Sequence, residues 1–261
     1  MATIRLSGIR ERTRGVIGTM IPFSKDQYDS IYPEGIENHY WNHARNRIIG
    51  RLLEKHHLSQ GKILEVGCGK GVVIDYLRTQ EIDCFGVELS DVPPIPRVAD
   101  RIVVSMDALN LPLDFRDSIE TILLLDVIEH FNNPAEFIQS ILSSYSSVKR
   151  VVVTVPARQE LWTNYDVYNG HFKRYRLRDI APLVDSFAQV EEVGYFNHVL
   201  YPVFWLFAKG FKNRATIVRA PSGMVIYFHR FLSLILQSDY TVIPKEMPGT
   251  SILALLSIRR K

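Results

Sequence analysis

The chain has 261 residues, of which 46% are hydrophobic and 23% are charged, and its formal net charge is +3. This composition supplies a large core, which excludes a wholly disordered protein, and the small net charge argues against general nucleic-acid binding. The two cysteines lack the spacing of a metal site and are typical of a reducing compartment rather than of a disulfide scaffold.

Residues 1–35 are interpreted as an N-terminal arm and residues 36–261 as one α/β domain. The arm carries four arginines, which are Arg5, Arg10, Arg12 and Arg14. It has no apolar stretch typical of a signal peptide, so we expect a cytoplasmic protein whose arm folds over the domain. An arginine-rich transit peptide is the alternative. No apolar run is long enough to span a bilayer.

The first predicted helix covers about residues 37–55, where apolar residues recur at helical spacing. A buried strand starting at Ile63 then ends in the turn Gly67-Cys68-Gly69-Lys70-Gly71, and a second helical pattern begins at Val72. Glycines adopt positive φ and carry no Cβ, so a backbone built from them lies directly against a ligand. The spacing is G-x-G-x-G, because Val72 stands where a dinucleotide fingerprint has its third glycine.

Three further apolar strands lead to acidic residues. Residues 84–87 lead to Glu88, residues 101–104 lead to Asp107 and Ala108, and residues 121–125 lead to Asp126, Val127, Ile128, Glu129 and His130. A carboxylate after the second strand can accept hydrogen bonds from both hydroxyls of a ribose. Glu88 is therefore the candidate ribose ligand.

The alternation of strands and helices continues to the end of the chain. Asn133 is the expected N-cap of a helix that starts with Pro134, and residues 151–155 and 251–258 are the expected fifth and last strands. Continuous Val/Ile/Leu runs are typical of parallel strands that are buried on both faces. We expect a doubly wound, Rossmann-like, mostly parallel sheet of seven strands, with an N-terminal helical cap and a helical insertion at about 196–249.

This series of motifs resembles the class I S-adenosylmethionine-dependent methyltransferases, over residues 35–195 and the last strand. The segments 35–41 and 170–175 resemble the small-molecule branch of that family. The resemblance implies S-adenosyl-L-methionine as the cofactor and S-adenosyl-L-homocysteine as the product. It assigns to the cofactor site Glu65, Gly67, Cys68, Gly69, Gly71, Glu88, Leu89, Asp107, Ala108, Asp126 and Val127.

A hydroxyl acceptor must lose its proton during methyl transfer, and histidine titrates nearest neutrality. The candidate catalytic residues are His130, ranked first, His171 and Glu129. No metal ligand is assigned. The alternative is a divalent ion held by Asp126, Glu129 and His130, by resemblance to the acid-x-x-Glu-His pattern of some quinone-biosynthesis O-methyltransferases, which have Glu where this chain has Asp126.

Two further features bear on the partner. A basic cluster could bind an anionic group of the acceptor or could be a solvated helix start; its members are Lys173, Arg174, Arg176 and Arg178. The apolar, aromatic segment 196–235 predicts two cap helices. They could wall an acceptor pocket, contact a membrane surface peripherally, pair two subunits in a homodimer, or simply pack on the sheet.

Three functions remain open. The favoured one is methyl transfer, with oxygen as the expected target atom, to a small or lipid- or carbohydrate-linked acceptor rather than to nucleic acid. The second is methylation of a protein or nucleic acid, although residues 126–129 lack the Asn/Asp-Pro-Pro-Tyr/Phe motif of amine methylation. The third is a non-catalytic subunit that binds the cofactor and serves a partner protein.

Overall fold

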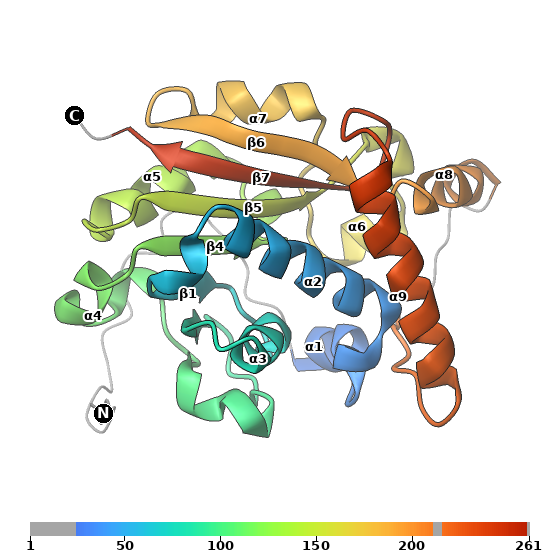
Figure 1. The fold of residues 1–261 in the computed structure, drawn as a ribbon, viewed down its shortest axis with the longest axis horizontal. Coiled ribbons are helices and arrows are strands. Elements are labelled where there is room, and N and C mark those ends of the chain that lie inside the picture. The colour runs from blue at the N-terminus through green and yellow to red at the C-terminus, as the bar shows by residue number, and fades with distance from the viewer. Residues whose placement is uncertain (1–24, 211–215, 260–261) are drawn as a thin grey trace.

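The computed structural model describes residues 25–210 and 216–259, and its centre is a seven-stranded sheet with the order β3-β2-β1-β4-β5-β7-β6 (Figure 1). Neighbouring strands from β3 to β5 are parallel, whereas β7 is antiparallel to both β5 and β6. The strands are β1 (Ile63–Val66), β2 (Cys84–Val87), β3 (Ile102–Val103), β4 (Thr121–Leu125), β5 (Arg150–Pro156), β6 (Ala188–Phe196) and β7 (Ser251–Ile258). The predicted Rossmann-like architecture is confirmed.

Helices cover both faces of this sheet, because the inner strands are apolar on both sides. The helices are α1 (Lys25–Ile31), α2 (Tyr40–Lys55), α3 (Val72–Thr79), α4 (Leu113–Asp117), α5 (Pro134–Ser144), α6 (Asn164–Tyr168), α7 (Leu177–Val184), α8 (Leu200–Gly210) and α9 (Val225–Val242). Buried side chains of α2 and α3 pack on one face of the sheet, and those of α5 and α7 pack on the other. The carboxyl ends of the parallel strands are left free to form a site.

Local sequence signals explain where several elements begin and end. The Asn133 side chain accepts a hydrogen bond from the Glu136 amide, as expected of an N-cap before Pro134. The helix predicted at 37–55 is interrupted at His39, whose backbone is extended, so that a short 3-10 turn (Ile36–Asn38) precedes α2. Strand β3 is shorter than predicted by one residue at each end, and the 3-10 turn Pro96–Arg101 takes up the first of them.

The insertion before β7 contains the two predicted cap helices, α8 and α9, and α9 is longer than the sequence pattern indicated. The inner side of α9 packs against α2, where the His229 Nδ1 atom accepts a hydrogen bond from the Tyr40 amide at 3.1 Å. Among the described residues, no helix has both the length and the apolar character needed to cross a bilayer.

The described part of the N-terminal arm lies over the glycine turn. The Lys70 ammonium donates a hydrogen bond to the carbonyl of Tyr32 at 2.7 Å, and the rings of Tyr28 and Tyr32 lie within van der Waals distance of the position that a Cβ at Gly69 would take. The four arginines of the arm lie outside the described residues. Helix α1 thus forms a cover over the end of β1.

Candidate functional site

The turn after β1 needs glycine at specific positions. Gly67 and Gly71 have φ values of 73° and 82°, in the left-handed region that favours glycine. A Cβ at Gly71 would lie 2.2 Å from Cδ1 of Ile102, and one at Gly67 would lie 3.0 Å from Cγ2 of Val127. The chain therefore turns from β1 into α3 with its backbone close to the ends of the neighbouring strands.

Glu88 joins the end of β2 to this turn. Its side chain is buried, and its two carboxylate oxygens accept hydrogen bonds from the amides of Gly69, at 2.9 Å, and Ser90, at 2.8 Å. Tyr28 of α1 packs here, and its pKa is raised by burial and by the negative charge of Glu88. The Tyr28 side chain also hydrogen-bonds to Glu88, so three partners hold the carboxylate in place and one of its roughly four acceptor positions is left for a ribose hydroxyl.

A pocket opens between the turn, the end of β2 and helix α5. Six of the expected residues line it, which are Gly67, Glu88, Leu89, Asp107, Ala108 and Val127. Asp107 is fixed because its Oδ1 atom accepts a hydrogen bond from the Leu109 amide at 2.9 Å. The rest of the lining was not predicted from the sequence and consists of Val66, Val87, Met106, Leu109, Phe131, Phe137 and Ser140. This mostly apolar wall suits the flat face of an adenine ring.

Beside the turn lies a group of charges at the end of β1. The Arg45 guanidinium pairs with the Asp126 carboxylate at 2.6 Å, although the sequence analysis gave Arg45 no role. Glu65 is buried with its Oε2 atom unpaired among the described residues, and burial raises its pKa to about 8. A buried acid with a free oxygen fits a cationic group such as the ammonium of a methionine moiety.

Cys68 belongs to the turn by its backbone only. Its sulfur packs beneath the sheet, where a Cβ at Gly86 would lie 2.6 Å from it, and burial raises the pKa of its thiol. Cys68 and Cys84 are both buried free thiols. The assignment of Cys68 to the cofactor site therefore concerns its main chain, while its side chain fills the core.

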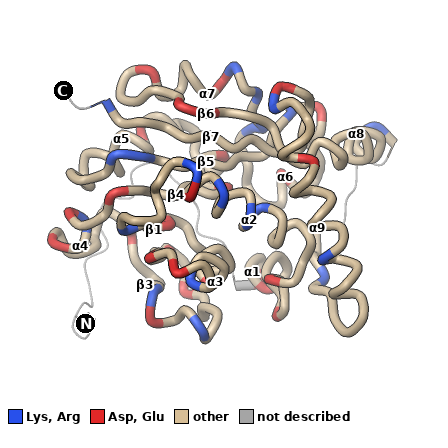
Figure 2. The backbone as a smooth tube through the Cα atoms, in the orientation of Figure 1, with Lys and Arg blue, Asp and Glu red and all other residues tan. Residues whose placement is uncertain are grey.

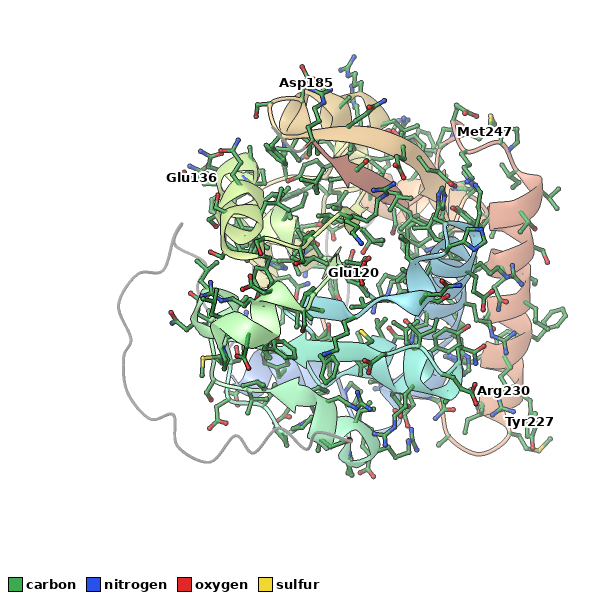
Figure 3. The ribbon with its side chains drawn as sticks, turned by 60° about the vertical axis from the view of Figure 1, so that its left-hand side comes forward. Glu120, Glu136, Asp185, Tyr227, Arg230 and Met247 are labelled. Carbon is green, nitrogen blue, oxygen red and sulfur yellow. The ribbon has the colours of Figure 1, made fainter. Side chains whose placement is uncertain are left out.

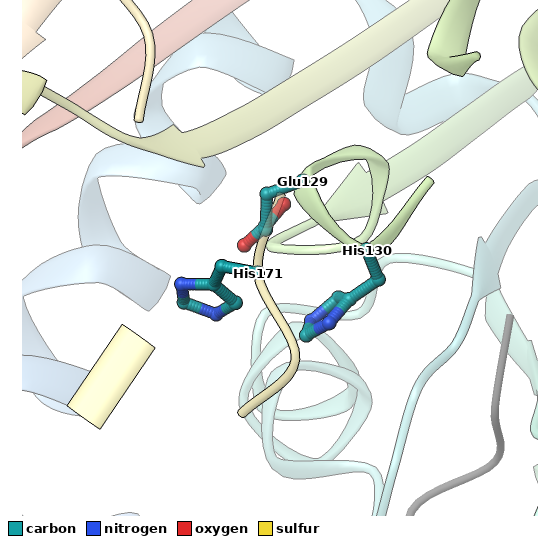
Figure 4. Close-up of side chains that lie close together, drawn as sticks. All are labelled: Glu129, His130 and His171. Carbon is teal, nitrogen blue, oxygen red and sulfur yellow. The ribbon is translucent and has the colours of Figure 1, made fainter. Parts of the chain in front are cut away.

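The structure also brings Glu129, His130 and His171 together (Figure 4). Glu129 and His130 lie in the 3-10 turn after β4, and His171 follows α6, in a loop that the sequence did not place. One ligand atom from each of the three side chains lies within 4.8 Å of the others, and the two imidazole rings are 4.9 Å apart. We call these three residues the carboxylate–histidine cluster.

Burial determines the charge state of this cluster. Both oxygens of Glu129 are buried without a hydrogen-bond partner among the described residues, and burial together with the charge of Asp126 raises the pKa of Glu129 well above its usual value. Burial, and then the neighbouring His171, lowers the pKa of His130 to about 4, so this imidazole is neutral near pH 7. The cluster thus contains the Glu129 carboxyl group, whose oxygens have no hydrogen-bond partner among the described residues, and the neutral imidazole of His130.

Asp166 orients His171. The Nδ1 atom of His171 lies 2.9 Å from Oδ1 of Asp166, and the Arg174 guanidinium lies 2.8 Å from the same oxygen. Although burial acts in the opposite direction, these two partners hold the pKa of Asp166 below its usual value. An ionised carboxylate only accepts, so Nδ1 carries the hydrogen and Nε2 keeps the free lone pair.

The predicted basic cluster is divided by the fold. Arg174 is buried against Asp166, and Lys173 lies over the ring of Tyr175, at 4.4 Å. Tyr175 itself is fully buried, and its hydroxyl bonds to the carbonyl of Ile128, so it supports the loop from below. A second surface pocket is lined by Arg158, Arg176, Leu177, Arg178, Tyr195 and Glu246. The four basic residues therefore do not form one anion receptor.

The structure favours a different set of ligands for a divalent ion from the set suggested by the sequence, which was Asp126, Glu129 and His130. Asp126 is engaged by Arg45, and the histidine at position 171 completes a set with Glu129 and His130. One carboxylate and two imidazoles are ligands that suit Zn, Mn or Fe ions. The unpaired oxygens of Glu129 are compatible with a cation, whose charge would favour the ionised carboxylate that burial otherwise disfavours.

Comparisons with known proteins agree with this geometry. A family model described as "Methyltransferase domain" matches residues 38–187. No curated protein sequence matches the chain significantly. Among solved structures, the methyltransferase domain of bacterial CtHen1 is 12% identical, with a TM-score of 0.52, and the match covers 84% of this chain and 99% of that one.

Two other solved structures are similar to a lesser degree. A SAM-dependent methyltransferase from Archaeoglobus fulgidus is 14% identical, with a TM-score of 0.44, and the match covers 81% of this chain and 94% of that one. The plantazolicin methyltransferase BpumL, in complex with SAH, is 17% identical with a TM-score of 0.49, covering 90% and 88%.

Proposed function

Because this chain belongs to the methyltransferase domain family, whose members use S-adenosylmethionine, we propose that it methylates a hydroxyl oxygen of a small or lipid- or carbohydrate-linked acceptor, at a divalent-cation site formed by the carboxylate–histidine cluster. The observation that carries this proposal is the buried Glu129 carboxylate, which has two unpaired oxygens next to two histidines.

The cofactor half of the reaction follows from the residues at the strand ends. S-adenosylmethionine supplies a methyl group that is activated by the sulfonium charge. Glu88 would hold the ribose, Asp107 and the apolar wall would hold the adenine, and Glu65 would compensate the ammonium of the methionine end. These contacts would place the donor next to Val127, at the start of the loop that carries Glu129 and His130.

The acceptor half depends on the carboxylate–histidine cluster. A divalent ion supplies a positive charge that lowers the pKa of a hydroxyl bound to it. Glu129 would provide the anionic ligand after losing the proton that burial favours, whereas His130 is neutral and would bind without first losing one. Asp166 fixes the tautomer of His171, which aligns the second imidazole. The acceptor hydroxyl, acidified in this way, would release its proton to solvent; its oxygen would attack the methyl carbon, and the electron pair of the breaking C–S bond would pass to sulfur.

The proposal is tested by binding and by transfer. We expect Mn²⁺, followed by electron paramagnetic resonance, to bind the wild-type protein and to bind Glu129→Gln and His171→Gln at least about tenfold more weakly. Glu136→Gln is the matched control, because this carboxylate lies exposed on α5. Unchanged Mn²⁺ binding in Glu129→Gln would overturn the metal site.

Transfer of radiolabelled methyl groups identifies the acceptor class. The panel contains catechols, monophenols, sugars, a polyprenyl-linked phenol, an RNA oligonucleotide and a peptide. We expect labelling of hydroxyl acceptors among the first four. Labelling of RNA or peptide alone would replace the proposed acceptor class. Tight binding of S-adenosylhomocysteine without transfer to any of them would favour a non-catalytic subunit.

A further inference from the structure

Helix α9 exposes one apolar face over most of its length. Tyr227, Phe228, Phe231 and Leu234 are 69%, 58%, 58% and 53% exposed, and Val242 in the last turn is 79% exposed. Their spacing of three, four and seven or eight residues puts them on one side of the helix, together with the 39% exposed Ile235. The opposite side is buried and contains Ser233, Leu236, Gln237 and Asp239. Helix α9 therefore has apolar residues on its solvent-facing side as well as on its buried side. We call the exposed apolar residues of α9 the stripe.

No element of the described chain covers this stripe. Figure 3 shows Tyr227 and Arg230 on α9 at the outer edge of the molecule. Figure 1 shows α8 on the same side of the molecule, and two of its apolar residues, Val203 and Leu206, are 44% and 63% exposed. Exposed apolar side chains gathered along one helix face are typical of a surface that meets a partner.

The charge of this region indicates the kind of partner. The sequence contains no Asp or Glu between residues 197 and 238. The described basic residues of this segment are Lys209, Arg219 and Arg230, and the tube along α8 in Figure 2 is tan with one blue stretch and no red. The Lys209 ammonium lies over the Trp205 ring, at 4.1 Å. Aromatic and aliphatic side chains flanked by cations without acids are typical of helices that lie in the headgroup region of anionic bilayers.

We propose that the stripe of α9, with the exposed apolar residues of α8, docks on an anionic lipid bilayer with α9 parallel to the membrane plane. A second copy of the chain fits less well. A two-fold contact places the same patch on both sides, so the cations of one protomer would face those of the other with no acid from this segment to neutralise them. Anionic headgroups provide the missing charge.

The docking face is connected to the catalytic site. The buried side of α9 is bonded to α2 through His229 and Tyr40, and α2 carries Arg45, the partner of Asp126. Docking through α9 would therefore hold α2, which borders the catalytic site, close to the bilayer. Membrane docking requires neither cofactor nor acceptor, so it can be tested independently of the proposed methyl transfer.

The test measures co-sedimentation of the full chain with phosphatidylcholine vesicles, with and without phosphatidylglycerol. We expect binding only with the anionic lipid, and weaker binding at high salt. The double variant Phe228→Ser/Phe231→Ser is expected to bind about tenfold less or weaker. Arg230→Gln is expected to bind about fivefold less, because one cation near the surface is lost.

Leu113→Ser is the matched control, since Leu113 is 62% exposed on α4. It should bind vesicles like the wild type. Thermal unfolding of every variant checks the fold, and Leu234→Ser replaces the double variant if that one unfolds. The proposal would be overturned if the wild-type protein did not bind anionic vesicles, or if the stripe variants bound them as well as the wild type. A wild-type dimer that becomes monomeric in the stripe variants in sedimentation velocity would also overturn it, because the face would then belong to a second copy.

Discussion

The glycine turn and the carboxylate–histidine cluster both lie at the carboxyl ends of the parallel strands, but they are assembled in different ways. The turn is one contiguous segment whose backbone conformation requires glycine, as at Gly71. The cluster combines two residues after β4 with His171, which comes from a loop beyond β5 and is held by Asp166. A site built from backbone is therefore visible in local sequence, whereas a site built from converging side chains depends on the path of a loop.

The largest effect is expected at the cluster. Glu129→Gln should lower kcat by about 100-fold to 10,000-fold, the usual range for losing proton removal from an acceptor. Its affinity for S-adenosylhomocysteine should stay unchanged, because Glu129 does not line the cofactor pocket. Steady-state kinetics and calorimetry measure the two quantities. A parallel loss of cofactor affinity would mean that the two regions are not separate.

A substitution at the end of β2 is expected to weaken cofactor binding and to leave the carboxylate–histidine cluster unchanged. Glu88→Ala should weaken S-adenosylhomocysteine binding by about 10-fold to 100-fold, because hydrogen bonds to a charged group are lost. Mn²⁺ binding should not change. Calorimetry with NAD as a second ligand checks the specificity, and NAD binding in place of the adenosyl ligands would contradict the assignment of the pocket.

Gly71 and Gly170 allow backbone strain to be separated from lack of space. Both have positive φ, but a Cβ at Gly170 would meet no atom within 4 Å, whereas one at Gly71 would overlap Ile102. Gly170→Ala should cost about 1–2 kcal/mol of unfolding free energy from the left-handed conformation alone. Gly71→Ala should cost more and also impair cofactor binding. Urea denaturation measures both, and equal losses would show that the turn can relax.

The same contrast explains how much of the molecule was predictable. Runs such as 121–125 and 251–258 coincide with strands β4 and β7, because buried apolar strands have a strong local signal. Glu88 and Asp107 line the pocket because acids that follow parallel strands share one edge of the sheet.

Other parts of the site have no local signal. Arg45 lies on a helix long before its partner Asp126, and nothing in either segment indicates their contact. Phe131 and Phe137 form a wall of the pocket only because the loop after β4 folds back on α5. Nothing in the sequence around Glu129 indicates that both of its carboxylate oxygens are buried without a side-chain partner among the described residues. Long-range packing decides each of these features.

The smallest effect concerns the attachment of the insertion to the sheet. Glu192 of β6 pairs with Lys245, which follows α9, and with Lys55 and His56 at the end of α2. Although burial acts in the opposite direction, these hydrogen bonds lower the pKa of Glu192 to about 2. A carboxylate whose pKa is lower in the folded protein stabilises it above its ordinary value near 4.5, and this contribution is lost as the pH falls toward 2.

Glu192→Gln should therefore lower Tm at pH 7 by about 2–4 °C, and the difference from wild type should shrink on acidification below pH 4.5. Glu191→Gln is the control, because the Glu191 side chain lies next to Glu192 on the same strand and pairs with Arg150 of β5. Calorimetric scans across this pH range measure both variants. If the Tm difference between Glu192→Gln and the wild type grew on acidification, its sign would be opposite to that expected of a carboxylate held ionised. Glu192 would then not stabilise the attachment of α9 and α2 to the sheet through its ion pairs.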